Sequence, residues 1–157
     1  MLFSVIGHYS LILGLFIGLI LIFFSIKNFR NSINLDTKIL SFTFLQFILV
    51  VVSFLCLILS FVFSDFSNET VFNNSHTTKP LFYKISGTWG NHEGSLLLWL
   101  LVLTLFIFLF LIKTKNQPTK YKILTLVFQQ IIIIGFFVFL IKTSNPFNYL
   151  YPIPEEG

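Results

Sequence analysis

The sequence predicts an all-α, polytopic membrane protein with about four transmembrane helices. Of its 157 residues, 55% are hydrophobic and 10% are charged, whereas charged residues make up about a quarter of an ordinary soluble domain. The apolar residues form four blocks, each close to the ~20 residues with which a helix crosses about 30 Å of hydrocarbon. We therefore expect a single membrane domain over residues 1–157, with the lipid bilayer as its main solvent.

The first block covers about residues 2–26. It must be helical, because unpaired backbone amides in hydrocarbon are costly and four spans are too few to close a barrel. It carries Gly7, Gly14 and Gly18 on one helix face, and the last two match the GxxxG pattern. Such a notch either lets another helix approach closely or is a chance match within an apolar segment.

Three further blocks follow, over about residues 39–63, 95–112 and 123–141. Residues 64–94 separate the second and third of the four blocks, and we expect them to form a long loop on the positive side of the membrane. Three glutamines lie inside the second and fourth blocks. Because an amide in a membrane seeks a hydrogen-bond partner, we expect all three to face helices and not lipid. They are Gln46, Gln129 and Gln130.

Basic residues predict the orientation of the chain. The connectors after the first and third blocks hold seven of the ten cations and only one acid, Asp36. Because short cytoplasmic loops are enriched in lysine and arginine, we expect both termini and residues 64–94 on the opposite side. That side is the intermembrane space in a mitochondrion or the periplasm in a bacterium. The seven cations are Lys27, Arg30, Lys38, Lys113, Lys115, Lys120 and Lys122.

Amino-acid usage suggests an organelle-encoded protein. Phe occurs 22 times and Ala does not occur, although a helical membrane protein would gain from Ala. Phe, Ile, Asn and Lys use AT-rich codons and Ala uses GC-rich ones, so we interpret the bias as that of a reduced, AT-rich genome. The expected location is the mitochondrial inner membrane, with a bacterial inner membrane as the alternative. No nucleic-acid partner is expected.

The titratable residues predict no metal site and no catalytic group. Cys56 lies alone within the second block, where it cannot form an internal disulfide and is read as a packing residue. His8 and His76 do not have the spacing of metal ligands. No Asp, Glu, Lys or Arg falls within the spans, which argues against a proton pump or an ion-coupled carrier.

The most informative stretch, GTWGNHEGS, runs from Gly87 to Ser95, where the third block begins. If helical geometry begins near Gly87, two tryptophans, a histidine and a leucine lie within an arc of about 80°, bordered by a carboxylate. Gly90 and Gly94 would let a ligand or another backbone come close. That arrangement could hold a flat, partly apolar ligand. The candidate site residues are Trp89, His92, Glu93 and Trp99, with Leu96 between them.

A structural role for the same residues stays open. Trp89 and Trp99 would then be anchors at the membrane interface. Glu93 would stabilise the positive end of the helix dipole, and Ser95 would cap the helix. The residues of the loop do not by themselves separate an anchoring role from a binding role.

The run from Gly87 to Leu100, GTWGNHEGSLLLWL, resembles the N-terminal signature of CcmF, the membrane subunit of the haem lyase in the multicomponent cytochrome c maturation system. Further stretches agree in order, so the resemblance covers essentially the whole chain, but only the N-terminal part of a full-length family member. These stretches are Gly7-His-Tyr-Ser10, Phe63-Ser-Asp-Phe66, Ser75-His76, Leu81-Phe-Tyr-Lys84, Thr143-Ser-Asn-Pro-Phe147 and Pro152-Ile-Pro-Glu-Glu-Gly157.

The resemblance implies haem as cofactor and covalent attachment of haem to the CxxCH thiols of apocytochrome c. In the family, a tryptophan-rich WWD segment and histidines beside it or in later spans handle haem, and none of these matches a position here. By resemblance to split plant mitochondrial versions, we expect one piece of a divided CcmF, whose remaining fragment carries the WWD segment. Implied partners are a haem chaperone, a thiol-reducing maturation subunit and apocytochrome c.

The expected role is therefore that of a membrane scaffold and docking surface within a haem lyase complex. Trp89, His92, Glu93 and Trp99 would contact haem or its chaperone, and this piece alone would not ligate haem. The alternative is a non-catalytic structural subunit of a mitochondrial respiratory-chain membrane complex, with other subunits of that complex as partners. Copurification with either machinery separates the two hypotheses.

Overall fold

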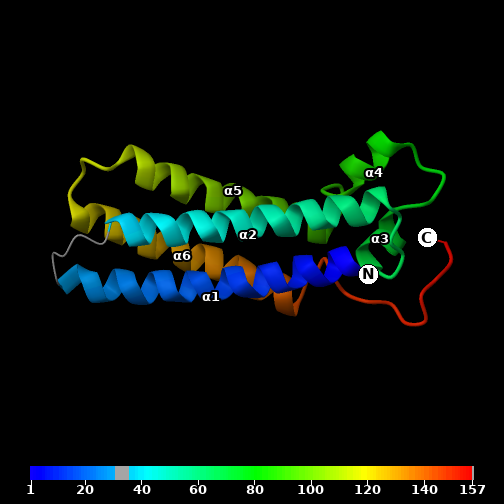
Figure 1. Cartoon of the computed structure of the whole chain (residues 1–157), viewed down its shortest axis with the longest axis horizontal. Coiled ribbons are helices and arrows are strands. Elements are labelled where there is room, and N and C mark those ends of the chain that lie inside the picture. The colour runs from blue at the N-terminus through cyan, green and yellow to red at the C-terminus, as the bar shows by residue number, and fades with distance from the viewer. Residues whose placement is uncertain (31–35, 157) are drawn as a thin grey trace.

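Four long helices run side by side in the computed structural model (Figure 1). The structure describes residues 1–30 and 36–156. All four helices are long and apolar enough to cross a membrane, with mean hydropathies between 2.5 and 3.0. The predicted all-α membrane fold is therefore confirmed. The four helices are α1 (Leu2–Arg30), α2 (Asp36–Val62), α5 (His92–Lys113) and α6 (Thr119–Lys142).

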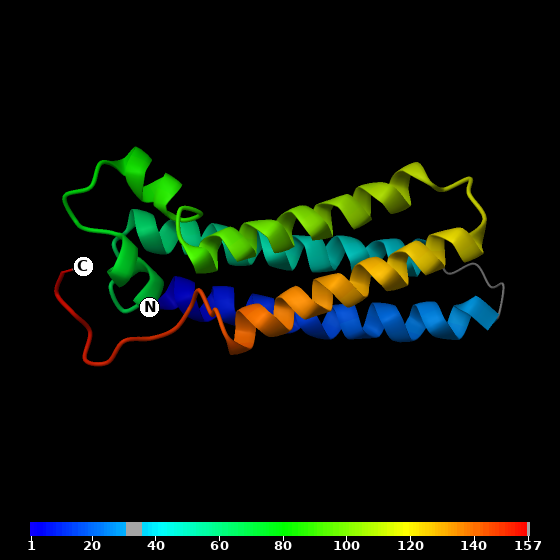
Figure 2. The same ribbon diagram turned by 180° about the vertical axis from the view of Figure 1, so that it is seen from behind.

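The long helices form a closed ring. Helix α1 packs against α2 and α6, and α5 packs against the same two helices from the other side. The view from behind shows α5 and α6 running across the bundle in front of α1 and α2 (Figure 2). Each long helix therefore packs mainly against two of the others and leaves an outer face for lipid.

The bundle has two distinct ends (Figure 1). Both chain termini lie at one end, with the two short helices α3 (Glu69–Asn74) and α4 (Leu81–Gly87), and we call it the termini end. The other end holds the turn of residues 114–118 between α5 and α6, and we call it the connector end. Residues 31–35 of the first predicted connector lie outside the described residues.

Helices extend past the apolar blocks at the connector end. Because α2 begins at Asp36 and α6 at Thr119, three lysines that we placed in connectors belong to the first turns of helices. A long lysine side chain can continue a helix and still carry its charge toward the headgroups. The predicted loop of residues 64–94 is likewise partly helical, since it contains α3 and α4. The three lysines are Lys38, Lys120 and Lys122.

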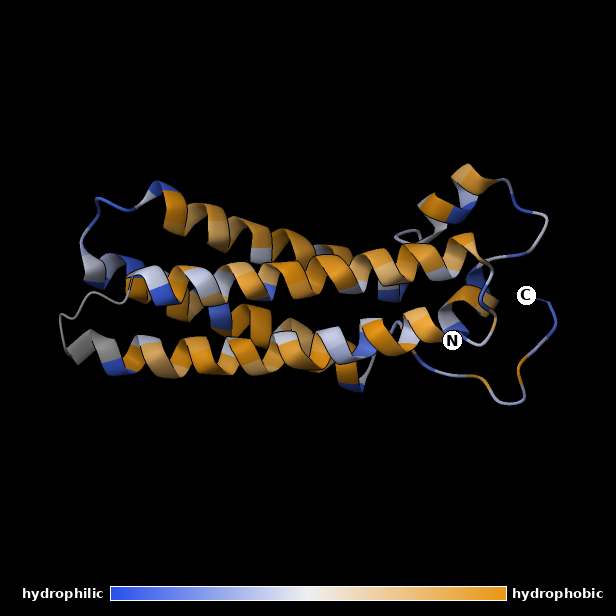
Figure 3. Ribbon diagram, in the orientation of Figure 1, coloured by the Kyte–Doolittle hydropathy of each residue, from blue (hydrophilic) through white to orange (hydrophobic). Residues whose placement is uncertain are grey.

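Apolar residues cover the helices along their length, and polar residues gather at the two ends (Figure 3). Large side chains on the outer faces are open to the surroundings, as in Phe16, Phe106 and Phe128, which are 57%, 62% and 65% exposed. Such an apolar surface is unfavourable in water and favourable in hydrocarbon. The outer surface therefore agrees with lipid as its solvent.

The glycines of α1 form the predicted notch, and side chains fill it. A Cβ on Gly7 would lie 2.3 Å from Cζ of Phe147, and one on Gly14 would lie 2.7 Å from Cζ of Phe137. Both rings are almost fully buried. Gly18 faces a pair of amides. At Gly14 and Gly18 the notch lets α6 approach closely, as the GxxxG pattern suggested, and at Gly7 it receives the ring of Phe147.

The amide pair lies in the interior of the bundle. Gln130 Nε2 donates to Gln46 Oε1 at 2.8 Å, and Gln46 Nε2 donates back to Gln130 Oε1 at 3.3 Å and to the Gly14 carbonyl at 3.2 Å. Both glutamines are fully buried, as predicted. Gln129 is half-buried and takes no part in this cluster. The pair joins α1, α2 and α6 where water cannot supply hydrogen bonds.

Candidate functional site

The GTWGNHEGS loop is a break between two helices. Helix α4 ends at Gly87 and α5 begins at His92. The prediction of one continuous helix that begins near Gly87 is therefore wrong. Asn91 causes the break, since its Oδ1 accepts from Gly94 N at 2.7 Å while its Nδ2 donates to the carbonyls of Gly87 and Thr88. Asn91 caps α5 in the position that we predicted for Ser95, whose hydroxyl instead donates to the His92 carbonyl.

Gly94 lets the backbone fold back on itself at this break. A Cβ at Gly94 would lie 1.6 Å from the carbonyl oxygen of Thr88, closer than any side chain can come. Thr88 itself is fully buried. The predicted close approach therefore occurs at Gly94 between two parts of this chain. Gly90, by contrast, would meet nothing nearer than 3.4 Å.

Trp89 of the loop and Trp99 of α5 both lie on the surface. Trp89 belongs to the turn between α4 and α5 and is 42% exposed, whereas Trp99 lies two turns along α5 and is 61% exposed. His92 and Trp99 are seven positions apart and share a face of α5 with Leu96. Because Trp89 stands outside this helix, the predicted single arc contains only the α5 residues.

His92 connects the start of α5 to the end of α6. Its Nδ1 lies 2.9 Å from Oγ of Ser144, the second residue after α6. Its ring also meets the Phe139 ring edge-on, with centroids 6.4 Å apart. These contacts hold the imidazole while the residue stays exposed. The orientation of His92 therefore depends on a segment 52 positions away.

Glu93 lines a polar cavity of about 240 Å³ at the termini end. The walls come from α3, from the start of α5 and from the chain after α6. Glu93 also lies in the first turn of α5, where a carboxylate is favoured by the helix dipole. The other lining residues are Glu69, Thr70, Asn73, Asn74, Thr143, Ser144, Asn145 and Asn148.

Asn68 holds the parts of the termini end together. It is fully buried. Its Nδ2 donates to Ser4 Oγ at 3.1 Å and to the Pro146 carbonyl at 3.0 Å, while its Oδ1 accepts from the backbone of Thr70 and Val71. One side chain therefore joins α1, α3 and the C-terminal tail. Our sequence reasoning missed it, although an asparagine directly before Glu69 is a helix-capping signal.

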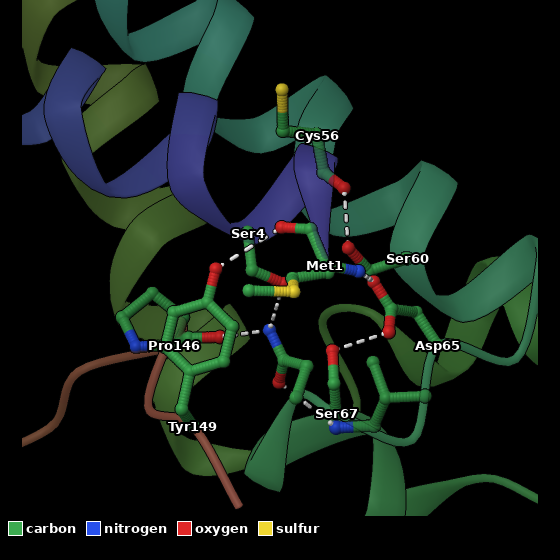
Figure 4. Close-up of polar contacts among 10 residues, drawn as sticks. Met1, Ser4, Cys56, Ser60, Asp65, Ser67, Pro146 and Tyr149 are labelled. Atoms are coloured by element: carbon green, nitrogen blue, oxygen red, sulfur yellow. Dashed lines mark hydrogen bonds and ion pairs between the residues drawn. The ribbon is translucent and has the colours of Figure 1, made fainter. Parts of the chain in front are cut away.

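A second polar group beside Asn68 joins the N-terminus to the same region (Figure 4). The amino group of Met1 forms an ion pair with Asp65, which also accepts from the Ser67 hydroxyl. Tyr149 donates its hydroxyl proton to the Met1 carbonyl at 3.1 Å. Within α2, the Cys56 carbonyl accepts a hydrogen bond from Ser60 Oγ at 3.0 Å. The Cys56 side chain is buried, which agrees with its predicted role in packing.

The C-terminal tail returns to the turn before α4. The Glu156 carboxylate accepts hydrogen bonds from the hydroxyl and the backbone N–H of Thr77, and lies 3.3 Å from His76 Nδ1. The hydrogen bond from the Thr77 side chain, then that from its backbone, lowers the pKa of Glu156 below its ordinary value. The tail is thus part of the surface at the termini end.

The residues at this end do not fit a haem pocket by themselves. Haem binding needs an apolar cleft with an axial ligand. The cavity beside Glu93 is lined by carboxylates, amides and hydroxyls, and both tryptophans lie on the surface. Within residues 1–30 and 36–156, no three His, Cys, Asp or Glu side chains are grouped as metal ligands. By itself, the described surface at this end therefore lacks the features of a haem pocket.

Comparison with known proteins agrees with this fold. No family model matches the chain. CycK of Rhizobium meliloti, a cytochrome c-type biogenesis protein, is 40% identical over 155 residues, which are 96% of this chain and 22% of that protein. CcmF of Escherichia coli is 35% identical over 154 residues, or 97% of this chain and 24% of its own length.

Over almost its whole length the chain is similar to the N-terminal part of CcmF-type proteins. It spans less than a quarter of the length of those two relatives, both of which are bacterial. A solved structure, the cytochrome c haem lyase CcmF, superposes with a TM-score of 0.83 over 96% of this chain and 25% of that one. At 24% identity this match shows a shared fold.

Proposed function

We propose that the chain acts in cytochrome c maturation as the N-terminal membrane part of a CcmF-type haem lyase, with the termini end as its docking surface. The names of the relatives, which are cytochrome c-type biogenesis proteins, support the process. In the split form expected from the resemblance, a separate chain would supply the remaining spans and the WWD segment.

The division of labour within the GTWGNHEGS loop carries this proposal. Thr88, Asn91 and Gly94 build the break between α4 and α5. Trp89 and Trp99 take no part in it and expose 42% and 61% of their surface. Tryptophan is the residue most enriched among those that dominate binding energy at protein interfaces. The break therefore has a hydrogen-bonded base, and the two tryptophans beside it expose aromatic surface suited to a partner.

The chemistry of haem attachment explains what such a surface would do. Haem supplies the vinyl groups to which cysteine thiols add, and the protein must hold both reactants in register. The exposed tryptophans would offer aromatic planes to haem or to the chaperone that carries it. His92, oriented by Ser144, and Glu93, beside the polar cavity, would bind polar groups of the peptide or chaperone. No residue here is assigned a bond-making role.

The proposed orientation places the termini end on the positive side of the membrane. Seven of the ten cations belong to the connector end, and five of the six acids belong to the other end. Protease added from the positive side should therefore cut near residues 76–80 and spare residues 114–118. Cleavage of residues 114–118 from that side would overturn the orientation.

Paired substitutions in the loop test the docking role. Trp89→Ala combined with His92→Ala should lower haem-stained c-type cytochromes about tenfold or more, because interface hot spots each contribute about 2 kcal/mol. The amount of the protein in the membrane should not change. Phe106→Ala with Phe128→Ala is the matched control, since both are exposed aromatic residues of the spans that lie far from the loop.

Normal haem staining in the loop variant would leave only an anchoring role for Trp89 and His92. Equal loss of staining in the control would show a general defect of the bundle.

The alternative of a respiratory-chain subunit is tested by copurification. If the protein travels with an oxidase or a dehydrogenase, and its loss leaves holocytochrome c unchanged, the maturation role fails.

A further inference from the structure

A cavity of about 310 Å³ lies at the connector end, away from the candidate site. It is formed where α2, α5 and α6 come together beside the turn that links α5 to α6. Its walls are mostly aliphatic, and two lysines stand among them. The lining residues are Thr37, Ile39, Leu40, Leu111, Lys115, Lys122, Ile123 and Leu126.

The position of the cavity is that of a boundary between hydrocarbon and headgroups. Helix α5 ends at Lys113, and α6 begins at Thr119, so the lysines lie where the spans end. Leu111 and Leu126 lie further along these two helices, on the side of the bilayer core. The cavity therefore has an apolar inner part and a basic rim.

Charge at this end is strongly one-sided. The sequence places seven cations here against the single acid Asp36. Lys122 is only 6% exposed, and its Nζ donates to the Lys115 carbonyl at 3.4 Å, which ties the turn to α6 beside the cavity. The Lys115 side chain, in contrast, belongs to an exposed residue. A ligand at the rim would therefore meet an excess of positively charged side chains. The hydrogen bond from Lys122 holds the backbone of the turn at Lys115 in place.

We propose that this cavity binds an anionic phospholipid. Its phosphate would lie at the rim beside Lys115, and an acyl chain would follow Ile39, Leu111 and Leu126 inward. Basic pockets between membrane helices are suited to anionic headgroups, and each nearby lysine strengthens binding about fivefold. The aliphatic walls favour a lipid over a soluble anion, and the charge favours an anionic lipid over a zwitterionic one. This inference does not depend on the proposed function.

Native mass spectrometry of the full chain, purified in mild detergent with any copurifying subunits, tests the proposal. Phosphatidylglycerol should bind about tenfold more tightly than phosphatidylcholine with the same acyl chains. Lys115→Gln should weaken phosphatidylglycerol binding about fivefold, and Lys115→Glu should weaken it further. Lys142→Gln, which removes the same charge at the opposite end of α6, should leave binding unchanged. Both substituted lysines are exposed, so neither change disturbs the packed interior.

A photoreactive acyl chain locates the lipid directly. Phosphatidylglycerol with a diazirine in one chain should label peptides that contain Leu111 or Leu126. Equal binding of the two lipids, or equal loss in the Lys142→Gln variant, would overturn the proposal. Complete displacement of the lipid by millimolar inorganic phosphate would also overturn it, because the site would then take a soluble anion.

Discussion

The two ends of the bundle are built in different ways. At the termini end, Asn68 bonds to Ser4 and Pro146, which are 64 and 78 positions away in the sequence. At the connector end, Ser41 and Thr114 each bond to the carbonyl four residues before them. The first kind of contact exists only once the bundle has formed, and the second forms within one helix.

From this difference we infer which end is better suited to specific recognition. Ordering remote segments costs conformational entropy, about 1–2 kcal/mol per residue, so precise long-range contacts are expected where geometry matters. The termini end has such contacts, and Trp89 and His92 lie exposed on its surface. His92 is itself held by the remote residue Ser144. The connector end instead has seven of the ten cations, and the attraction of charge needs no precise geometry. We therefore place docking at the termini end and lipid binding at the connector end.

The largest expected effect at the termini end comes from Asn68→Ala. The change removes two donated and two accepted hydrogen bonds at a fully buried position. Because each buried group left without a partner costs about 1–3 kcal/mol, the free energy of unfolding should fall by about 3–5 kcal/mol. Denaturant titration in bicelles measures it. Asn73→Ala, at an exposed asparagine of α3, is the control and should cost less than about 1 kcal/mol.

The next effect is expected at the break before α5. Gly94→Ala would place Cβ against the Thr88 carbonyl, so the backbone must shift and stability should fall by about 3 kcal/mol. Gly135→Ala, whose Cβ would meet nothing within 4 Å, should instead stabilise α6 by up to about 1 kcal/mol. The same titration measures both. Equal stability of the two variants would mean that the break is not built as described.

The smallest effect is expected at the connector end. Lys120→Gln removes one exposed cation from the first turn of α6 and should change the free energy of unfolding by less than about 0.5 kcal/mol. A loss comparable to that of Asn68→Ala would contradict the contrast between the two ends. It would show that the connector end, too, is held together by specific contacts.

Composition and the four apolar blocks were sufficient for the membrane fold. A span must satisfy its own backbone hydrogen bonds, so length and hydropathy predict a helix without knowledge of its neighbours. Gln46 and Gln130 followed from the same reasoning, because a buried amide needs a partner. Their mutual pairing did not follow, since it depends on which faces of α2 and α6 meet.

The sequence identified the residues of the candidate site, but the predicted geometry of the site was wrong. Trp89, His92, Glu93 and Trp99 were identified from the loop, but a continuous helix through them was wrong because Asn91 ends one helix and begins another. The sequence could have predicted this break, since Asn91 precedes α5 and asparagine is a preferred residue at the start of a helix. The contact between His92 and Ser144 was not, because nothing local relates residues 52 positions apart.

The sequence by itself determined that this protein crosses a membrane, roughly where its four spans lie and which family its loop resembles. These properties depend on hydropathy, charge and motif, which are all local in the chain. Only the tertiary structure decided that Asn68 joins three segments and that the glycines of α1 receive aromatic rings. Such contacts depend on helix rotation and packing, which arise from the whole bundle and from no single segment.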